Sequence, residues 1–284
     1  MEPHAVAASV KSIFSLPEVV FKINELINSG DTTNIELEQT ILNDPALTAK
    51  LLKFANSAYF GFPKKIETIS NAVALIGHSE LRNLAIATSV TSVFKGIPSD
   101  LVDMESFWHH SVSTGVIARL MAYDVNRRER IFIAGLLHGI GKLIMFSQFP
   151  DESSKILSAS NHDEEAMIIA ERQIFGFTYA DLSAAFLDEW SLPESIWKIV
   201  ESQLDPAKAV QSKTEAYILH LAVKIAGHKQ NHQNREINFD DLQSLCKPEI
   251  WDNLGLNTEV IELINTVAEL QISDMFNCIK PCAT

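Results

Sequence analysis

The chain is poor in the residues that interrupt helices. Gly (11) and Pro (10) together account for about 7% of the 284 residues, against roughly 12% in average usage. Apolar residues recur at helical spacing along most of the chain, with no sustained β-type alternation and no repeat of fixed period. So few turn-forming residues favour long helices over a turn-rich sandwich or barrel. The sequence therefore predicts an all-α protein with a helix content above ~60%, well over the base rate of about one-third.

Breaks in the helical pattern predict two lobes. Asp44-Pro45 is typical of a helix start, with Asp44 as N-cap and Pro45 in the first turn. The break Gly96-Ile97-Pro98 is the strongest candidate boundary between the lobes. The predicted organisation comprises an N-terminal tail, an N-terminal helical lobe, a second helical core and a C-terminal helical extension that packs on the core: residues 1–12, 13–98, 103–205 and 206–284, respectively.

Charge and composition exclude several classes of function. The net charge is −13 and no dense run of Lys and Arg occurs, which argues against a nucleic-acid groove. No stretch of ~18 uninterrupted apolar residues and no secretory leader is found, so we expect no membrane span. The cysteines Cys246, Cys278 and Cys282 are odd in number and widely spaced, and we expect free thiols. These features predict a soluble, cytoplasmic protein.

Two histidines lie in apolar helical segments. His110 falls in FWHHSVSTGVIARLMA, and His138 falls in GLLHGIGKL. A buried imidazole requires a hydrogen-bond partner or a metal ion, and a partner within the core is the commoner case. These segments, together with the block NDPALTAKLLKFANSAYFG, resemble the HDOD family, the HD-related output domains of bacterial signalling proteins. The resemblance extends over roughly residues 14–205.

The resemblance implies a relationship to the HD superfamily of metal-dependent phosphohydrolases and cyclic-dinucleotide phosphodiesterases. In those enzymes, converging histidines and aspartates hold one or two metal ions, which lower the pKa of bound water towards ~7. The positions that correspond to the metal ligands in this sequence are His110, His138, Gly139, Tyr179, Glu201 and Val223. Both histidines remain, but the acidic positions are Gly139 and Val223. The sequence thus indicates a degenerate site with no metal and no cofactor.

Two alternatives stay open at this site. Glu201, Asp181 or Asp188 can act as a ligand from a shifted position, because one helical turn moves a side chain ~5.4 Å along the axis. Lys142, in the GIGK segment, is a candidate contact for an anion beside the degenerate pocket; the alternative for Lys142 is a solvated helix residue.

The resemblance implies a non-catalytic regulatory module with an all-α, two-lobed fold. Its partner is expected to be another signalling protein or a small ligand. The sequence alone identifies neither that partner nor the oligomeric state. The rival hypothesis is a metal-dependent phosphohydrolase with atypical ligands. A third is a small-ligand sensor that uses the former active-site cavity.

The loop that follows the NDPALT helix is the candidate interaction surface. It contains Asn56, Ser57, Tyr59, Phe60 and Gly61, and polar and aromatic residues in a loop suit recognition. The alternative is that the aromatic pair packs between the lobes. In either case we expect Asn56 and Ser57 to end their helix, and their side chains to hydrogen-bond the backbone across the turn.

The former metal pocket carries a further expectation. Protein interiors pack densely, so the bulky Tyr179 should point inward. We expect its hydroxyl, or a water beside it, to hydrogen-bond His110 or His138, because an unpartnered buried imidazole costs about 1–3 kcal/mol.

Overall fold

The predicted all-α class is confirmed. The computed structural model describes the whole chain except residues 123, 162, 233–235, 246, 255–257 and 280–284. α-Helices contain 74% of the described residues, and these residues include no strand. Two of the cysteines, Cys246 and Cys282, lie outside the described residues, whereas Cys278 is a buried free thiol.

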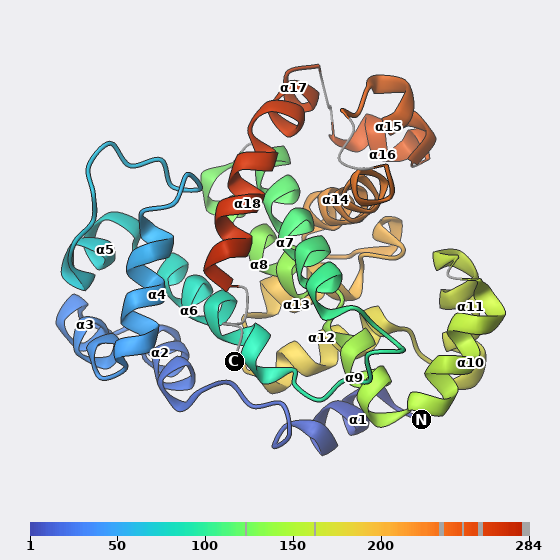
Figure 1. Ribbon diagram of the computed structural model, residues 1–284, viewed down its shortest axis with the longest axis horizontal. Helices are drawn as coiled ribbons and strands as arrows, with labels where there is room; N and C mark the ends of the chain where they lie inside the picture. The colour runs from blue at the N-terminus through green and yellow to red at the C-terminus, as the bar shows by residue number, and fades with distance from the viewer. Residues whose placement is uncertain (123, 162, 233–235, 246, 255–257, 280–284) are drawn as a thin grey trace.

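The N-terminal lobe is built from five helices (Figure 1): α2 (Glu18–Ser29), α3 (Asn34–Leu42), α4 (Pro45–Ala55), α5 (Ile69–Ile76) and α6 (His78–Val93). Local capping explains where two of these helices begin. Thr33 and Glu36 form a reciprocal capping box at the start of α3. The Asp44 side chain accepts the Leu47 N–H at 2.9 Å, which confirms its predicted role as N-cap of α4.

Within residues 1–12, the predicted N-terminal tail, the structure has a helix. Helix α1 (Pro3–Val10) packs against α12 (Tyr179–Glu189) in the second lobe. Pro3 stands in its first turn, where a missing N–H costs nothing. Val6 and Val10 are buried one turn apart on one face. Tertiary packing thus stabilises a helix that is too short to persist alone.

The second lobe surrounds a central antiparallel pair of helices, α7 (Met104–Met121) and α8 (Val125–Leu137). The remaining helices of this lobe are α9 (Ile140–Gln148), α10 (Pro150–Ser160), α11 (Glu164–Ile174), α12 and α13 (Glu194–Glu201). Helices α12 and α13 pack on each other. In addition, α12 packs on α9, and α13 packs on α8. Figure 1 shows α10 and α11 at the side of the molecule away from the N-terminal lobe.

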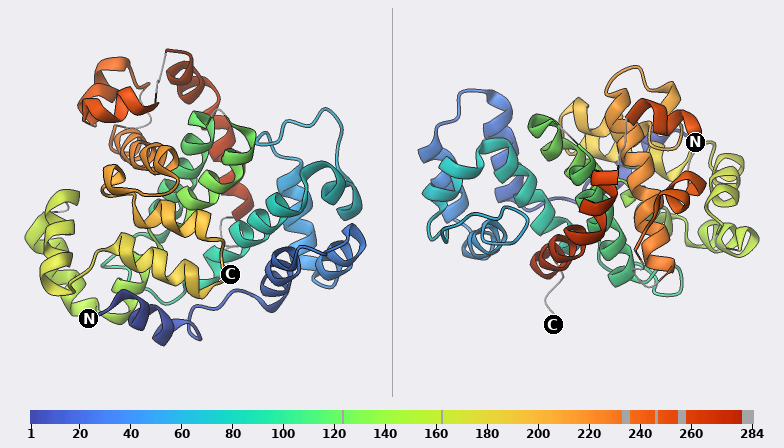
Figure 2. Two further views of the ribbon diagram at one scale, coloured as in Figure 1. Left: turned by 180° about the vertical axis from the view of Figure 1, so that it is seen from behind. Right: turned by 90° about the horizontal axis from the view of Figure 1, so that it is seen from above.

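The C-terminal extension packs on the same central pair. It contains a short 3₁₀ turn and five helices: η1 (Pro206–Lys208), α14 (Lys213–Asn231), α15 (Phe239–Leu245), α16 (Pro248–Leu254), α17 (Thr258–Thr266) and α18 (Ala268–Ile279). Helix α14 contacts α7 and α8, and α18 contacts α7, α6 and α4. The last helix therefore runs across both lobes (Figure 2).

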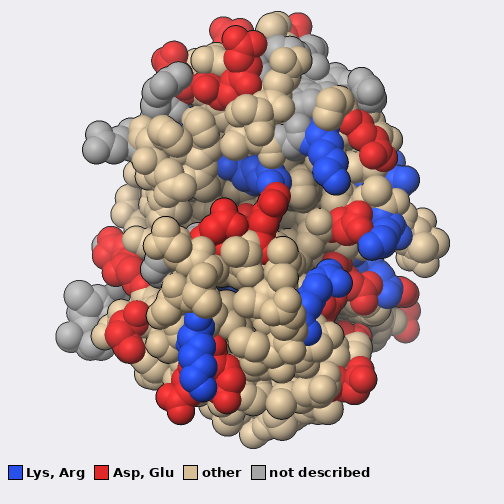
Figure 3. Space-filling model, turned by 90° about the vertical axis from the view of Figure 1, so that its right-hand side faces the viewer, with Lys and Arg blue, Asp and Glu red and all other residues tan. Residues whose placement is uncertain are grey.

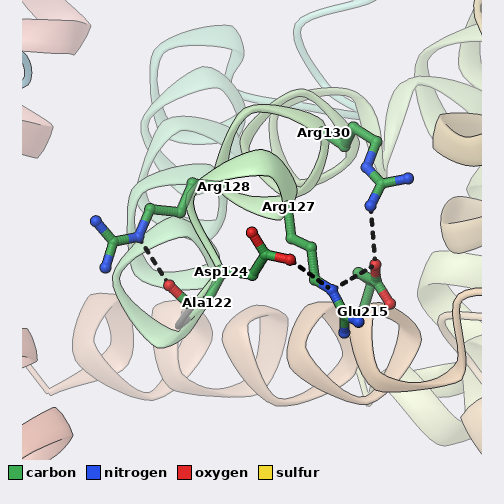
Figure 4. Close-up of polar contacts among 6 residues, drawn as sticks. All are labelled: Ala122, Asp124, Arg127, Arg128, Arg130 and Glu215. Atoms are coloured by element: carbon green, nitrogen blue, oxygen red, sulfur yellow. Dashed lines mark hydrogen bonds and ion pairs between the residues drawn. The ribbon is translucent and has the colours of Figure 1, made fainter.

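Arginines at the start of α8 hold α8 against α14 (Figure 4). Arg127 and Arg130 lie 3.7 Å and 3.3 Å from Oε1 of Glu215, whose side chain is only 6% exposed. Arg128 donates from Nε to the carbonyl oxygen of Ala122 at 2.8 Å, just after the end of α7. The carboxylate is buried but paired twice, which offsets its loss of hydration.

Residues Arg127–Gln148 are long and apolar enough to cross a bilayer by length and composition, although we expected no such segment. However, 78% of the most apolar window is buried inside the protein. The apolar residues of α8 and α9 therefore pack inside the protein core, which is compatible with a soluble protein.

Two glycines bring the central helices together. A Cβ atom at Gly135 would lie 2.6 Å from the Cα of Gly115, and one at Gly115 would lie 2.8 Å from the carbonyl oxygen of Phe132. Real side chains do not tolerate these distances, so α7 and α8 can cross this closely only where both residues lack a Cβ.

We expect Gly135→Ala to lower the free energy of unfolding by about 2 kcal/mol, because the added methyl group must push backbone apart. The matched control is Gly227→Ala in α14, where the nearest atom to a new Cβ would be 3.8 Å away. Gly227→Ala should raise the free energy of unfolding by about 0.5–1 kcal/mol, because alanine has a higher helix propensity than glycine. Urea denaturation of both variants measures the difference, and equal effects would contradict the packing argument.

Candidate functional site

His110 and His138 meet at the centre of the second lobe. His110 comes from α7, and His138 and Gly139 connect α8 to α9. The imidazole centroids are 5.4 Å apart. The His138 ring is buried, and its Nδ1 donates to the carbonyl oxygen of Gly135 at 2.6 Å. One nitrogen of this ring is thereby committed to the fold, which leaves only Nε2 as an acceptor.

Gln203 and His220 extend the site towards α14. Nε2 of Gln203 donates to the carbonyl oxygen of His138 at 3.0 Å, and Nδ1 of His220 donates to the carbonyl oxygen of Gln203 at 2.8 Å. Sequence reasoning did not assign these two residues to the site. The imidazole within the apolar segment ILHLAV was an available signal for His220, whereas nothing local marks Gln203.

Tyr179 points inward as predicted, with only 1% of its surface exposed. The hydroxyl does not bond an imidazole directly among the described residues: it donates to Oε1 of Glu164 on α11 at 3.2 Å, and the bond through a water stays a prediction. The backbone N–H of Tyr179 also donates to Glu171 at 2.8 Å. Both carboxylates come from α11, and a carboxylate is a stronger acceptor than a neutral imidazole.

Lys142 is partly buried, and its charge is paired. Its Nζ lies 3.8 Å from Oε1 of Glu164 and 4.1 Å from the centroid of the Tyr179 ring. The positive charge is thus compensated by one carboxylate and by the face of an aromatic ring. An anion at this position must compete with Glu164.

The residues present do not fit the metal ions of the HD superfamily. Asp181 closes a capping box with Thr178 at the start of α12. Glu201 is exposed and pairs with Lys198 at 2.9 Å, and Asp188 is exposed at the surface. In the part of the chain that the structure describes, no three His, Cys, Asp or Glu side chains converge on a common point. The shifted carboxylates weighed above therefore do not complete a ligand set.

Burial governs the protonation of the site. It lowers the pKa of His110 to about 4, with a further contribution from the positive charge of Lys142. Burial likewise holds the pKa of His138 well below its ordinary value. For Glu171, burial raises the pKa to about 7, although the N–H of Tyr179 opposes that rise. At neutral pH the two imidazoles are therefore uncharged.

A cleft of about 470 Å³ borders the histidine pair. Its walls include side chains from α7, α9, α11 and α14, among them His110, Lys142, Glu164, Val223, Lys224 and Gln230. Figure 3 shows the face that carries α10 and α11, where positive and negative side chains are interspersed. The site thus combines polar groups of both signs with no concentrated charge.

Asn56 and Ser57 follow α4, as predicted, but only Asn56 bonds across the turn. Its side chain donates to Leu52 and Ile66 at 2.7 and 2.8 Å and accepts the Ile66 N–H at 2.8 Å. The expectation for Ser57 is wrong: its Oγ is buried and has no hydrogen-bond partner among the described residues. The two hydrogen bonds between the Asn56 side-chain amide and the Ile66 backbone already hold the ends of the loop together.

Tyr59 lies in the junction between the lobes, not on a surface. Its ring is 2% exposed, packs 5.1 Å from Phe132 and lies 3.9 Å from the guanidinium of Arg119. Its hydroxyl contacts the buried Glu80 at 3.3 Å. Phe60 is partly buried and Gly61 is exposed with φ +60°, a conformation that favours glycine. An interaction surface on this loop would therefore exclude the tyrosine ring.

Comparison with known proteins identifies the family. Residues 13–206, more than half of the chain, match the HDOD domain. The chain belongs to the HDOD family. A relative from Treponema pallidum, called an uncharacterized protein, is 26% identical over 195 residues; the match covers 68% of this chain and 37% of that protein. The chain thus spans well under half of that relative's length.

Two solved structures resemble this HDOD protein. One is a "Putative phosphohydrolase" from Shewanella amazonensis, with a TM-score of 0.77, 23% identity and coverage of 97% of this chain and 98% of that chain. The other is a "Putative signal transduction protein" from Marinobacter aquaeolei, with a TM-score of 0.66, 21% identity and coverage of 94% and 60%. At these identities the likeness shows the fold alone.

The raised pKa of Glu171 predicts a pH dependence of stability. Because the folded protein binds this proton more tightly than the unfolded chain, stability falls as pH rises from about 4.5 towards about 7. Glu171→Gln keeps an acceptor for the Tyr179 N–H but cannot ionise. We expect the free energy of unfolding of the variant, minus that of the parent, to rise by about 1–3 kcal/mol from pH 4.5 to pH 7.5. Parallel urea titrations at both pH values measure this gain, and a constant difference would contradict it.

Proposed function

We propose that this HDOD protein is a non-catalytic regulatory module that acts by binding another protein or a small ligand. One observation carries the proposal: several polar groups around the former metal position contact one another or the backbone, although Oε1 of Gln203 is buried without a partner among the described residues. His138 bonds the carbonyl oxygen of Gly135. Tyr179 and Lys142 both contact Glu164. No carboxylate faces the histidine pair from residues 139 and 223. Such an arrangement stabilises a fold and leaves a cleft for recognition.

The names of the relatives divide between two functions. The Marinobacter name refers to signal transduction and the Shewanella name to hydrolysis. The site of this chain favours the first, because a hydrolase of this superfamily needs acidic ligands that position a metal-bound hydroxide. We also propose a bacterial cytosolic location and a signalling protein as the partner; the mostly buried apolar helix is consistent with such a location.

The first test measures metal and turnover together. Protein purified without chelator should hold far less than one equivalent of iron, manganese or zinc, and should not hydrolyse nucleotides or cyclic dinucleotides. Elemental analysis and product chromatography provide these measurements. Stoichiometric metal together with turnover that is lost in His138→Ala would establish the hydrolase instead.

The second test restores the acidic positions. A Cβ at Gly139 would meet only the Phe107 ring, at 3.5 Å, so a side chain fits there. We expect Gly139→Asp/Val223→Asp to bind Mn²⁺ at least tenfold more tightly than the parent, because carboxylates then join His110 and His138. The double Asn variant is the matched control, since it adds the same volume without charge. Equal Mn²⁺ affinity in both variants, measured by calorimetry, would show that missing carboxylates do not explain the degenerate site.

A further inference from the structure

A second pocket lies next to the cleft beside His110, between α14 and the short helices α15 and α16. Its volume is about 490 Å³, and it is also bordered by α11 and by residues 204–207 around turn η1. It shares Lys224 with the cleft, but its described lining residues include neither His110 nor Lys142. Pockets of this size are typical of small-molecule sites.

Three polar side chains of α14 line this pocket from one face of the helix. They are Tyr217, His220 and Lys224, which follow one another at intervals of three and four residues and therefore lie on the same side of α14. Because each helical residue adds about 1.5 Å, Tyr217 and Lys224 are about 10 Å apart along the axis. The pocket thus has two ends, one at Tyr217 and one at Lys224.

Carboxylates gather at the Tyr217 end. The tyrosine hydroxyl donates to Oε1 of Glu249 on α16 at 3.0 Å. Burial raises the pKa of this hydroxyl, and the hydrogen bond to Glu249 and the negative charges of Glu249 and Asp205 raise it further. Asp205 pairs with Lys208 at 2.7 Å, but both side chains are largely exposed, so water screens the pair. The Tyr217 end of the pocket is therefore negative.

Lysines gather at the other end. Lys224 is half-buried on α14, and Lys247 stands immediately before α16. Burial lowers the pKa of His220, and the positive charges of Lys224 and Lys247 lower it further, although the bond to Gln203 and the charge of Glu164 oppose that fall. Neither lysine forms an ion pair with a carboxylate of the described side chains. The Lys224 end is therefore positive.

This separation of charge decides which class of ligand fits. The described lining has two lysines and three carboxylates, those of Glu165, Asp205 and Glu249. A purely anionic ligand meets more repulsion than attraction, and a purely cationic one leaves both lysines unpaired. A molecule with one ammonium group and one carboxylate can pair with both ends.

The length of the pocket and its apolar wall indicate the size of that molecule. An extended dipeptide places its charged ends at most ~7 Å apart, which spans most of the distance between the two ends of the pocket. Apolar side chains are available to contact the side chains of such a ligand: Leu204, Pro206, Ala207, Leu245 and Ile250. Burial of apolar ligand surface against them favours binding.

We propose that this pocket binds a zwitterion of dipeptide size, with its ammonium group at the Tyr217 end and its carboxylate at the Lys224 end. The ammonium group contacts Glu249 and Asp205, and the carboxylate contacts Lys224 and Lys247. The proposal does not depend on the proposed function, because such a ligand fits the pocket whether the histidine pair serves regulation or hydrolysis.

Three peptides of the same length test the proposal on the full chain at neutral pH. Alanyl-leucine carries both charges, N-acetyl-alanyl-leucine carries only the carboxylate, and alanyl-leucinamide carries only the ammonium group. We expect alanyl-leucine to bind about tenfold more tightly than either blocked peptide, the ratio expected for one hydrogen bond between charged groups. NMR titration of the protein measures all three affinities.

Variants at the two ends assign each charge of the ligand to its partner. Lys224→Gln should weaken the binding of alanyl-leucine about tenfold and leave alanyl-leucinamide unchanged, because that peptide has no carboxylate. Glu249→Gln keeps an acceptor for Tyr217 and should weaken alanyl-leucine but not N-acetyl-alanyl-leucine. Lys247→Gln repeats the test of the positive end in case Lys224→Gln does not fold. Lys155→Gln, at an exposed position of α10 outside the pocket lining, is the matched control and should change no affinity.

Three results would overturn the proposal. The first is equal affinity for the three peptides, and the second is no binding of alanyl-leucine at millimolar concentration. The third is a loss in Lys224→Gln that is the same for all three peptides, because a loss of that kind reflects a change in the fold and not a contact with the carboxylate.

Discussion

The close crossing of α7 and α8 is the contact on which the rest of the second lobe depends. It is possible because Gly115 and Gly135 face each other without a Cβ. The same crossing brings His110 and His138 to within 5.4 Å. Helices α13, α14 and α18 then pack on this pair, and α6 joins it to the N-terminal lobe. The absence of a Cβ at these two glycines therefore allows both the core packing and the placement of the two histidines.

The polar centre of the second lobe is held by contacts between side chains of different helices. Tyr179 of α12 contacts Glu164 of α11 through its hydroxyl, and Lys142 of α9 contacts both that carboxylate and the tyrosine ring. Burial keeps both imidazoles neutral. Buried polar groups that are mutually satisfied stabilise one arrangement of helices. Such contacts fix how α9, α11 and α12 pack in this HDOD core.

The junction between the lobes is also polar, which is unusual for a buried contact. Glu80 is 3% exposed, and burial together with the charge of Glu129 raises its pKa to about 7. Tyr59 contacts it from the loop after α4, while Arg119 from α7 covers the tyrosine ring. Residues of both lobes thus share one cluster, in which Tyr59 bonds Glu80 and Arg119 stacks on the tyrosine ring, and α18 crosses the same boundary. The lobes are consequently held by specific contacts as well as by apolar area.

The sequence by itself determined the all-α class, the capped starts at Asp44 and Thr178, and the absence of carboxylates at residues 139 and 223. Those features depend on residues within a few positions of one another. Only the tertiary structure decided that Tyr179 bonds Glu164 in place of an imidazole, that the Ser57 hydroxyl has no partner among the described residues and that residues 3–10 form a docked helix. Each of these depends on which distant helix packs nearby. Local periodicity does not encode that choice, because it arises from the fit of whole helix faces.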